Sequence, residues 1–301
     1  MNDPAPAAPT RPHVTVVGDV GLDVVTKLAG AIVFGHDTRA QVSVAPGGAG
    51  GNTAAWLARH DLDVSLIARV GADEAGRTAR AELTAAGIDC LFAEDPVLAT
   101  CCVVVLVAED GDRTMLADRG ANKAFSEADV VLPDIDLSTR RAHLHLSGYV
   151  LLDEGSRAAG LASLAAARAA GWTTSLDPQA ATHIGTVGAA TFLEWAHGVD
   201  LLLPNDAELA ALGGVEMVLQ HLKALVVTHG RHGASWYSAD QRATVPAPQV
   251  HETDSTGAGD AFNAGLLASW LAGADPVDAL RAGVLAGTAA AAAIGARPQD
   301  G

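Results

Sequence analysis

The stretch Asp254-Ser-Thr-Gly-Ala-Gly-Asp260, which continues as Ala-Phe-Asn-Ala-Gly-Leu-Leu-Ala-Ser-Trp270, joins a glycine-rich turn to a strong helical pattern. Small residues before the helix leave the backbone N–H groups of its first turn uncovered, and these donors attract an anion together with the helix dipole. Gly257 and Gly259 let a phosphate approach without side-chain interference. Asp260 would stand beside that phosphate, which is electrostatically costly unless the carboxylate takes part in chemistry.

Asp260 has two interpretations. Phosphoryl transfer needs a group that receives the proton of the attacking hydroxyl, and a carboxylate next to the γ-phosphate could do this. The alternative is a glycine-rich turn in which Asp260 only caps the helix. On this stretch alone the two interpretations are evenly supported.

A second glycine-rich loop, Pro46-Gly-Gly-Ala-Gly-Gly-Asn52, also runs into a helix. Asn52 offers two donors and an acceptor, which suits sugar hydroxyls, although it could equally be a helix cap. Earlier in the chain, Asp23 follows a strand end, where ligands of α/β sheets bind, but a lone aspartate there is more often a loop cap. Neither loop carries the P-loop pattern or the full dinucleotide fingerprint.

Outward from these loops, short apolar strands alternate with helical patterns, which predicts an α/β fold with a mostly parallel sheet covered on both faces. Two β-rich segments, at about 22–45 and 98–117, break the alternation, and we expect them to pair as a small lid. Residues 1–12 are rich in Ala and Pro and indicate a flexible tail, which leaves 13–301 as one domain.

Composition excludes several function classes. The 301 residues carry a formal net charge of −16 and no Lys/Arg-rich run, which disfavours nucleic acid as a partner. The chain has no long strongly apolar run, so we expect no membrane span and a cytoplasmic location. Cys90, Cys101 and Cys102 fit a reducing compartment.

Four ordered motifs resemble those of the ribokinase-like (PfkB-type) carbohydrate kinases. Gly47, Gly48 and Asn52 resemble that family's N-terminal signature, and the stretch from Asp254 to Asp260 resembles its C-terminal signature. Between them, Asn205-Asp-Ala-Glu208 looks like the family's Asn-x-x-Glu motif, and Thr228-His-Gly-Arg-His-Gly233 looks like its nucleotide loop. The order holds from about His13 to Ala296. The resemblance implies a three-layer α/β/α domain with a small β lid, which in several members also forms a homodimer.

The resemblance also implies ATP-dependent phosphorylation of a hydroxyl, such as the hydroxymethyl group of a sugar or sugar derivative. Asp260 would be the general base, with the N–H groups of Gly257, Ala258 and Gly259 as the anion hole. The acceptor would be held by Asp23, Gly47, Gly48 and Asn52. Asn205 and Glu208 would organise Mg²⁺ through water, while Thr228, Gly230 and Gly233 would contact the nucleotide. Asp254 and the carbonyl of Thr256 would line a site for a monovalent cation such as K⁺.

Two further residues are weaker candidates. Ser147 ends a strand and is a candidate substrate contact, and Arg119 could meet an anionic acceptor, although a solvated surface arginine is the preferred interpretation. Gly21 and Ala49 stand where ribokinases commonly have Asn and Lys, which weakens any assignment of ribose as the acceptor. A nucleoside kinase of the same superfamily and a non-catalytic sugar- or nucleotide-binding regulator remain alternatives.

Overall fold

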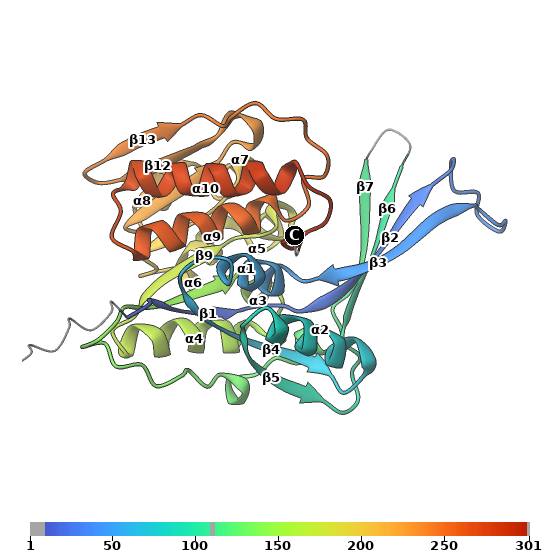
Figure 1. Ribbon diagram of the computed structural model, residues 1–301, viewed down its shortest axis with the longest axis horizontal. Helices are drawn as coiled ribbons and strands as arrows, with labels where there is room; N and C mark the ends of the chain where they lie inside the picture. The colour runs from blue at the N-terminus through green and yellow to red at the C-terminus, as the bar shows by residue number, and fades with distance from the viewer. Residues whose placement is uncertain (1–9, 109–111, 300–301) are drawn as a thin grey trace, which may run out of the picture.

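The computed structural model describes residues 10–108 and 112–299, and over these ranges nine strands form one sheet (Figure 1). Seven neighbouring strands of this sheet are parallel, namely β11, β10, β9, β8, β1, β4 and β5. The last two strands, β12 and β13, continue the sheet beyond β11 in antiparallel orientation. In sheet order they are β13 (Arg242–Val245), β12 (Ala234–Ser238), β11 (Ala224–Thr228), β10 (Leu201–Leu202), β9 (Thr173–Asp177), β8 (Ala142–Ser147), β1 (His13–Val17), β4 (Asp63–Gly71) and β5 (Asp89–Asp95). Residues 1–9 of the predicted tail lie outside the described residues.

Helices pack on both faces of this sheet, as a strand buried on both sides requires. One face is covered by α1 (Ala49–Leu57), α2 (Glu74–Ala85), α9 (Ala258–Leu271) and α10 (Pro276–Ala291). The other face is covered by α3 (Tyr149–Leu152), α4 (Arg157–Ala169), α5 (Ala181–Val187), α6 (Ala189–Trp195), α7 (Asp206–Ala211) and α8 (Val215–Leu219). The predicted three-layer α/β fold is therefore confirmed.

Alternating side chains of the central strands feed the two cores. In β1, Val14 and Val16 pack with α1 and α9, whereas Val17 joins the opposite core with Leu144 and Leu146 of β8. Each fully buried aliphatic side chain of this kind contributes roughly 2 kcal/mol. None of the helices in the described ranges is long and apolar enough to cross a membrane.

The two β-rich segments form a separate four-stranded sheet that stands away from the main body (Figure 1). Its order is β3 (Ala40–Gly47), β2 (Gly21–Leu28), β6 (Cys101–Val107) and β7 (Arg113–Asp118). The two segments pair as expected, and within the second of them β6 and β7 are antiparallel, with Val103 paired to Ala117. We refer to this sheet as the lid sheet.

The chain after β9 forms two short helices, α5 and α6, rather than one continuous helix. Gly188, with a φ of 89°, lies between α5 and α6, as the residue that caps the end of the first and the start of the second. This backbone conformation is easily reached by glycine and costly for a residue with a Cβ. The sequence pattern was helical on both sides of Gly188, so the break depends on that one residue.

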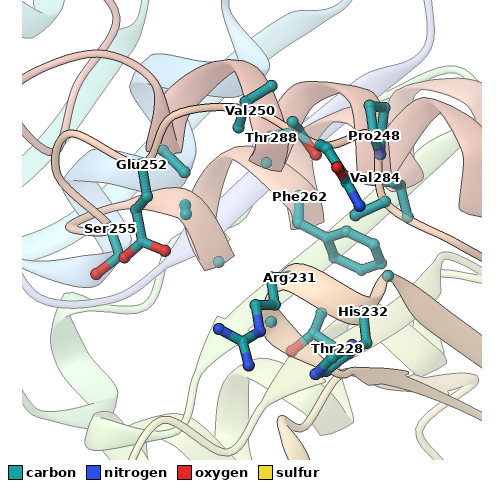
Figure 2. Close-up of a pocket in the computed structure, with 18 residues that line it drawn as sticks. Thr228, Arg231, His232, Pro248, Val250, Glu252, Ser255, Phe262, Val284 and Thr288 are labelled. Carbon is teal, nitrogen blue, oxygen red and sulfur yellow. The ribbon is translucent and has the colours of Figure 1, made fainter.

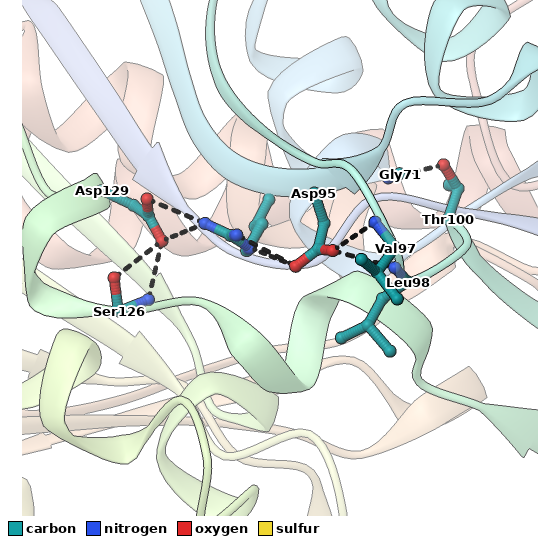
Figure 3. A network of polar contacts seen from close by, with 8 residues as sticks. Gly71, Asp95, Val97, Leu98, Thr100, Ser126 and Asp129 are labelled. Atoms are coloured by element: carbon teal, nitrogen blue, oxygen red, sulfur yellow. Dashed lines mark hydrogen bonds and ion pairs between the residues drawn. The ribbon is translucent and has the colours of Figure 1, made fainter.

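A network of charged groups fixes the main sheet to the segment that leads into the lid sheet (Figure 3). Arg69 of β4 donates to Asp95 at 2.9 Å and to Asp129 at 3.0 Å. The backbone N–H groups of Leu98 and Val97, together with Arg69, lower the pKa of Asp95 to about 2. The turn between β5 and β6 is thereby held in place immediately before the lid strand begins.

Candidate active site

The carboxyl ends of the parallel strands bring polar residues to one edge of the sheet, where ligands of open α/β sheets bind. Asp19 follows β1, Ser147 ends β8, Asp177 ends β9 and Thr228 ends β11. Asn205 follows β10 and pairs with Thr228 through an isolated bridge. The lid sheet joins the main domain at this same edge, since β2 begins at Gly21 just after β1.

Asp260 lies in the first turn of α9 and is 9% exposed. Gly257, in the left-handed conformation, is the residue that precedes this helix, and a Cβ there would come within 2.2 Å of the Ala296 carbonyl oxygen. Burial raises the pKa of Asp260 to about 7, against hydrogen bonds from Thr53 and Asn52 that lower it. A carboxylate of this kind is neutral or ionised near neutral pH and can exchange a proton there.

The loop before α1 meets Asp23 of the lid sheet. A Cβ on Gly47 would lie 2.2 Å from Asp23 Oδ1, so only glycine leaves room for this carboxylate. Gly48 immediately precedes α1, and Asn52 lies buried within that helix. Burial and the nearby Asp19 carboxylate raise the pKa of Asp23 to about 6. The predicted acceptor residues are therefore close together, beside Asp260.

Asp19 is a buried carboxylate that connects neighbouring segments of the site by hydrogen bonds. It accepts hydrogen bonds from the Ser147 hydroxyl at 3.0 Å and from the backbone of Gly50 at 3.3 Å. Ser147, proposed from sequence as a substrate contact, is 1% exposed and is engaged in holding Asp19. The interaction ties the end of β8 to the start of α1.

Arg119 is also bound to Asp19, at 3.3 Å, and lies 3.5 Å from Asp153. Its guanidinium covers the ring of Tyr149 at 4.8 Å, and its side chain is 21% exposed. The expectation of a solvated surface arginine is therefore wrong. No local sequence pattern indicates this position, because both carboxylate partners are distant along the chain.

A cavity of about 560 Å³ lies on the other side of α9 (Figure 2). Ala258 and Gly259 line it at the helix N-terminus, and Phe262 and Thr288 line its wall. In Figure 2, Arg231 lies across the space from Thr288. The nucleotide-loop residues expected from sequence, Thr228, Gly230 and Gly233, all line this cavity. Its volume and its helix N-terminus suit a nucleotide with its phosphates directed at α9.

Asn205 and Glu208 form a capping box at the start of α7. The Asn205 side chain accepts from the Glu208 backbone at 2.9 Å, and Glu208 accepts from the Asn205 backbone at 2.9 Å. Burial raises the pKa of Glu208. Burial, Glu208 and Asp260 together raise the pKa of Asp177, whose carboxylate accepts from Asn263 at 2.7 Å. Among the described residues, no three His, Cys, Asp or Glu side chains are grouped so that they could hold a metal ion directly. The neighbouring carboxylates of Glu208 and Asp177 are of the kind that a hydrated Mg²⁺ contacts through water.

Asp254 and Thr256 lie together, because the backbone N–H and the hydroxyl of Thr256 both donate to Asp254 Oδ1. Burial would raise the pKa of Asp254, but hydrogen bonds from Thr256, Arg113 and Gly295 lower it to about 2. Arg113, from the lid strand β7, donates to Asp254 at 2.8 Å and also bonds to the Thr256 hydroxyl. The positive charge beside this carboxylate thus comes from a guanidinium of the lid sheet.

Several groups of the site were missed by sequence reasoning: Asp19, Thr53, Asp177, Asn263 and Arg297. Asp177 stands in Leu-Asp-Pro directly after a predicted strand, a position that could have been noticed. Asn263 lies one helical turn after Asp260 and so shares its face. Arg297 lies near the chain end and gave no signal, because its partners are 245 and 250 residues away.

Comparison with known proteins shows which family the chain belongs to. The profile of the pfkB family carbohydrate kinases matches residues 12–300. The ATP-dependent ribose-1-phosphate kinase of Halopiger xanaduensis is 33% identical over 259 residues, which cover 83% of this chain and 82% of that protein.

Two solved structures are similar over nearly the whole chain. A fructokinase from Vibrio cholerae O395, solved with fructose, ADP and a calcium ion, has a TM-score of 0.79, is 26% identical and is covered over 95% of both chains. The adenosine kinase of Sinorhizobium meliloti has a TM-score of 0.81 at 22% identity, covering 97% of this chain and 96% of that one, and shares the fold. From its profile match, its relatives and its ribokinase-like fold, the chain belongs to the pfkB family of carbohydrate kinases.

Proposed function

We propose that this protein transfers the γ-phosphoryl group of ATP to a hydroxyl group of a sugar or sugar derivative, with Asp260 as the general base. One observation carries the proposal. Asp260 is buried in the first turn of α9, directly after Ala258 and Gly259, which line the cavity. On its other side it accepts a hydrogen bond from Thr53 of α1, the helix that follows the glycine-rich loop packed against Asp23. A donor phosphate and an acceptor hydroxyl would therefore meet at this carboxylate.

The base acts in its ionised form. With a pKa of about 7, Asp260 is deprotonated in a large fraction of molecules at neutral pH and can take the proton of the acceptor hydroxyl as that oxygen attacks phosphorus. Thr53, which donates to Asp260 Oδ1 at 2.9 Å, keeps the carboxylate in one orientation. A fixed orientation favours in-line attack because it removes the entropy of aligning the reacting groups.

Charge on the transferred group would be stabilised by the start of α9. The backbone N–H groups of Gly257, Ala258 and Gly259 stand at the positive end of the helix dipole, and that of Ala258 donates to the Ser255 carbonyl at 3.2 Å in this structure. Mg²⁺, held through water by Asn205 and Glu208 beside Asp177, would neutralise phosphate charge when bound. These residues would hold the nucleotide without a P-loop.

The acceptor would lie between the lid sheet and α1. Asp23, next to Gly47, faces this space from β2 and supplies a hydrogen-bond acceptor for a sugar hydroxyl. The lid sheet would exclude water, which otherwise competes as a phosphoryl acceptor. Arg113 supports a closing motion of this kind, because it joins β7 to Asp254 in the main domain.

The outer face of the lid sheet supports a homodimer. The strand register places Val42, Val44 and Leu116 on the face opposite Asp23, and these side chains are 59%, 62% and 56% exposed. Neighbouring exposed apolar side chains of this kind mark interaction surfaces. Sedimentation of the wild type and of Val44→Lys would test the dimer, which the charged substitution should dissociate.

The proposed activity is tested by measuring ADP release from Mg·ATP with a panel of sugars, sugar phosphates, sugar acids and nucleosides. Turnover that depends on one sugar-like acceptor, with the phosphorylated product identified by mass, supports the proposal. Turnover on nucleosides alone would assign the nucleoside-kinase alternative. Binding of ATP and a sugar without turnover would indicate a non-catalytic binding protein.

A further inference from the structure

The segment after α10 returns across the active site and contacts both glycine-rich loops. The Gly295 backbone donates to Asp254 at 3.1 Å, and Trp56 of α1 donates to the Ala296 carbonyl at 2.9 Å. Gly257 packs against Ala296 so closely that no Cβ would fit. This segment therefore lies between the anion-binding turn before α9 and the acceptor-side helix α1.

Arg297 extends from this segment into the acceptor side of the site. Its Nε donates to Asn52 Oδ1 at 3.1 Å, and its Nη2 donates to the Gly47 carbonyl at 3.1 Å. Its Nη1 lies 3.7 Å from Glu82, and the arginine side chain is only 10% exposed. A Cβ on Gly51 would stand 2.6 Å from Nη2, so the bare glycine of α1 opens the space that the guanidinium fills.

A buried guanidinium whose hydrogen bonds go to neutral groups needs an explanation. Burial lowers the pKa of Arg297, whereas the negative charges of Glu82, Asp23 and Asp260 raise it. Its nearest carboxylate, Glu82, is 49% exposed and too distant for a hydrogen bond, and its two short bonds go to neutral oxygens. Burying a charge in this way is costly for stability. The two neutral oxygens both belong to the residues that flank the proposed acceptor position.

We propose that Arg297 is a positioning residue for the phosphoryl acceptor, which it orients through Asn52 and Gly47. The inference rests on the proposed function. Since Nε donates to the amide oxygen of Asn52, the amide NH₂ is turned away from Arg297, and the Asn52 side chain hydrogen-bonds to Asp260. The second bond fixes the Gly47 carbonyl, on the residue whose missing Cβ makes room for Asp23. The planar guanidinium makes both bonds at once, which a lysine ammonium cannot reproduce.

The charges around Asp260 give this arrangement a second consequence. Asp260 is faced by Thr53 and Asn52 from α1, by Asp19 from the turn after β1 and by Arg297 from the C-terminal segment, and it also interacts with Asp177. Asn52 and Arg297 both lower the pKa of Asp260, in opposition to burial and Asp19. Loss of Arg297 removes its charge and frees the Asn52 amide to rotate. The base should then hold its proton to higher pH.

The test compares Arg297→Gln and Arg297→Lys with the wild type on an accepted substrate. We expect both variants to lose roughly 10- to 100-fold in kcat/KM for the acceptor, with the KM for ATP unchanged. For Arg297→Gln, which removes the positive charge, we also expect the acid limb of the pH profile of kcat/KM to move to higher pH. Glu82→Gln is the matched control, because it removes the outer charge and leaves both bonds of Arg297 in place. It should change kcat/KM by less than about twofold.

A double-mutant cycle with Asn52→Ala separates positioning from a general loss of structure. If Arg297 acts through Asn52, Arg297→Gln should cost much less in the Asn52→Ala background than in the wild type. Additive losses, equal effects on the KM of both substrates, or an unmoved acid limb would overturn the inference. Absence of turnover in the wild type would contradict the proposed function, whereas wild-type turnover with an unimpaired Arg297→Gln variant would contradict this inference alone.

Discussion

The hydroxyl group of Thr53 donates a hydrogen bond of 2.9 Å to Oδ1 of Asp260, across 207 residues of sequence. Thr53 belongs to α1, which follows the first glycine-rich loop, and Asp260 belongs to α9, which follows the second. Both side chains are buried. The two helices therefore present their N-terminal turns to the same space, and this bond fixes the carboxylate between them.

Thr53→Val should reduce the fraction of Asp260 that is ionised at pH 7, because it removes this donor. Because the Thr53 hydrogen bond lowers the pKa of Asp260, its loss should raise that pKa further. We expect kcat/KM at pH 7 to fall roughly fivefold or more, with recovery toward higher pH. Thr53→Ser, which keeps the hydroxyl, should resemble the wild type. Equal pH profiles for the serine and valine variants would show that the bond does not influence the base.

The activity of the wild type should depend on pH through ionisation of Asp260. Burial raises its pKa to about 7, and only the ionised form can accept the proton of the acceptor hydroxyl. We therefore expect kcat/KM for the acceptor to rise with pH up to a bend near 7. A profile that is flat from pH 5.5 to 8.5 would be incompatible with this carboxylate as the base.

Asp260→Asn should make the folded protein more stable at alkaline pH. The pKa of Asp260 is raised on folding, so the native state binds its proton more tightly than the unfolded state does. Stability is then lost as the pH rises from the unfolded pKa toward about 7. We expect the variant to gain roughly 3 °C or more in Tm at pH 8, and less at pH 5. A lower Tm at pH 8 would contradict the assignment of a raised pKa.

Arg69→Met should destabilise the protein by leaving the Asp95 and Asp129 carboxylates without their cation (Figure 3). We expect Tm to fall by roughly 3 °C or more, since these side chains are mostly buried. Arg77→Met, which removes an exposed pair with Glu74, is the control and should change Tm little. Similar losses in the two variants would show that the Arg69 network has no special structural role.

The order of the elements and the glycine-rich loops could be predicted from sequence because their signals are local. Glycines before a helical pattern, at residues 47–52 and 254–260, indicate anion-binding turns wherever they occur. The strand alternation likewise predicts the parallel sheet, whose carboxyl edge collects Asn205 and Thr228. These inferences need only periodicity and the rule that parallel strands end at one edge. The expectation that Asp23 follows a strand end is wrong, because Asp23 lies within β2 of the lid sheet.

The remaining site residues depend on tertiary contacts that no local pattern records. Arg119 was expected to be solvated, but Asp19 and Asp153 approach it from other segments and bury it. Arg297 follows a short Ala-rich stretch and acquires its meaning only when the chain returns to Asn52. Asp177 could be placed at a strand end, but its closeness to Glu208 depends on the packing of α7.

The central claim, that Asp260 is the general base, is tested most directly by comparing kcat of the wild type and Asp260→Asn on the same acceptor, with the Kd for ATP measured in parallel. Asp278→Asn, which changes an exposed carboxylate of α10, serves as the control. We predict a loss of about 10²–10⁴-fold in kcat for Asp260→Asn, with ATP binding preserved. A loss smaller than about tenfold, in a folded variant that binds ATP, would contradict the claim.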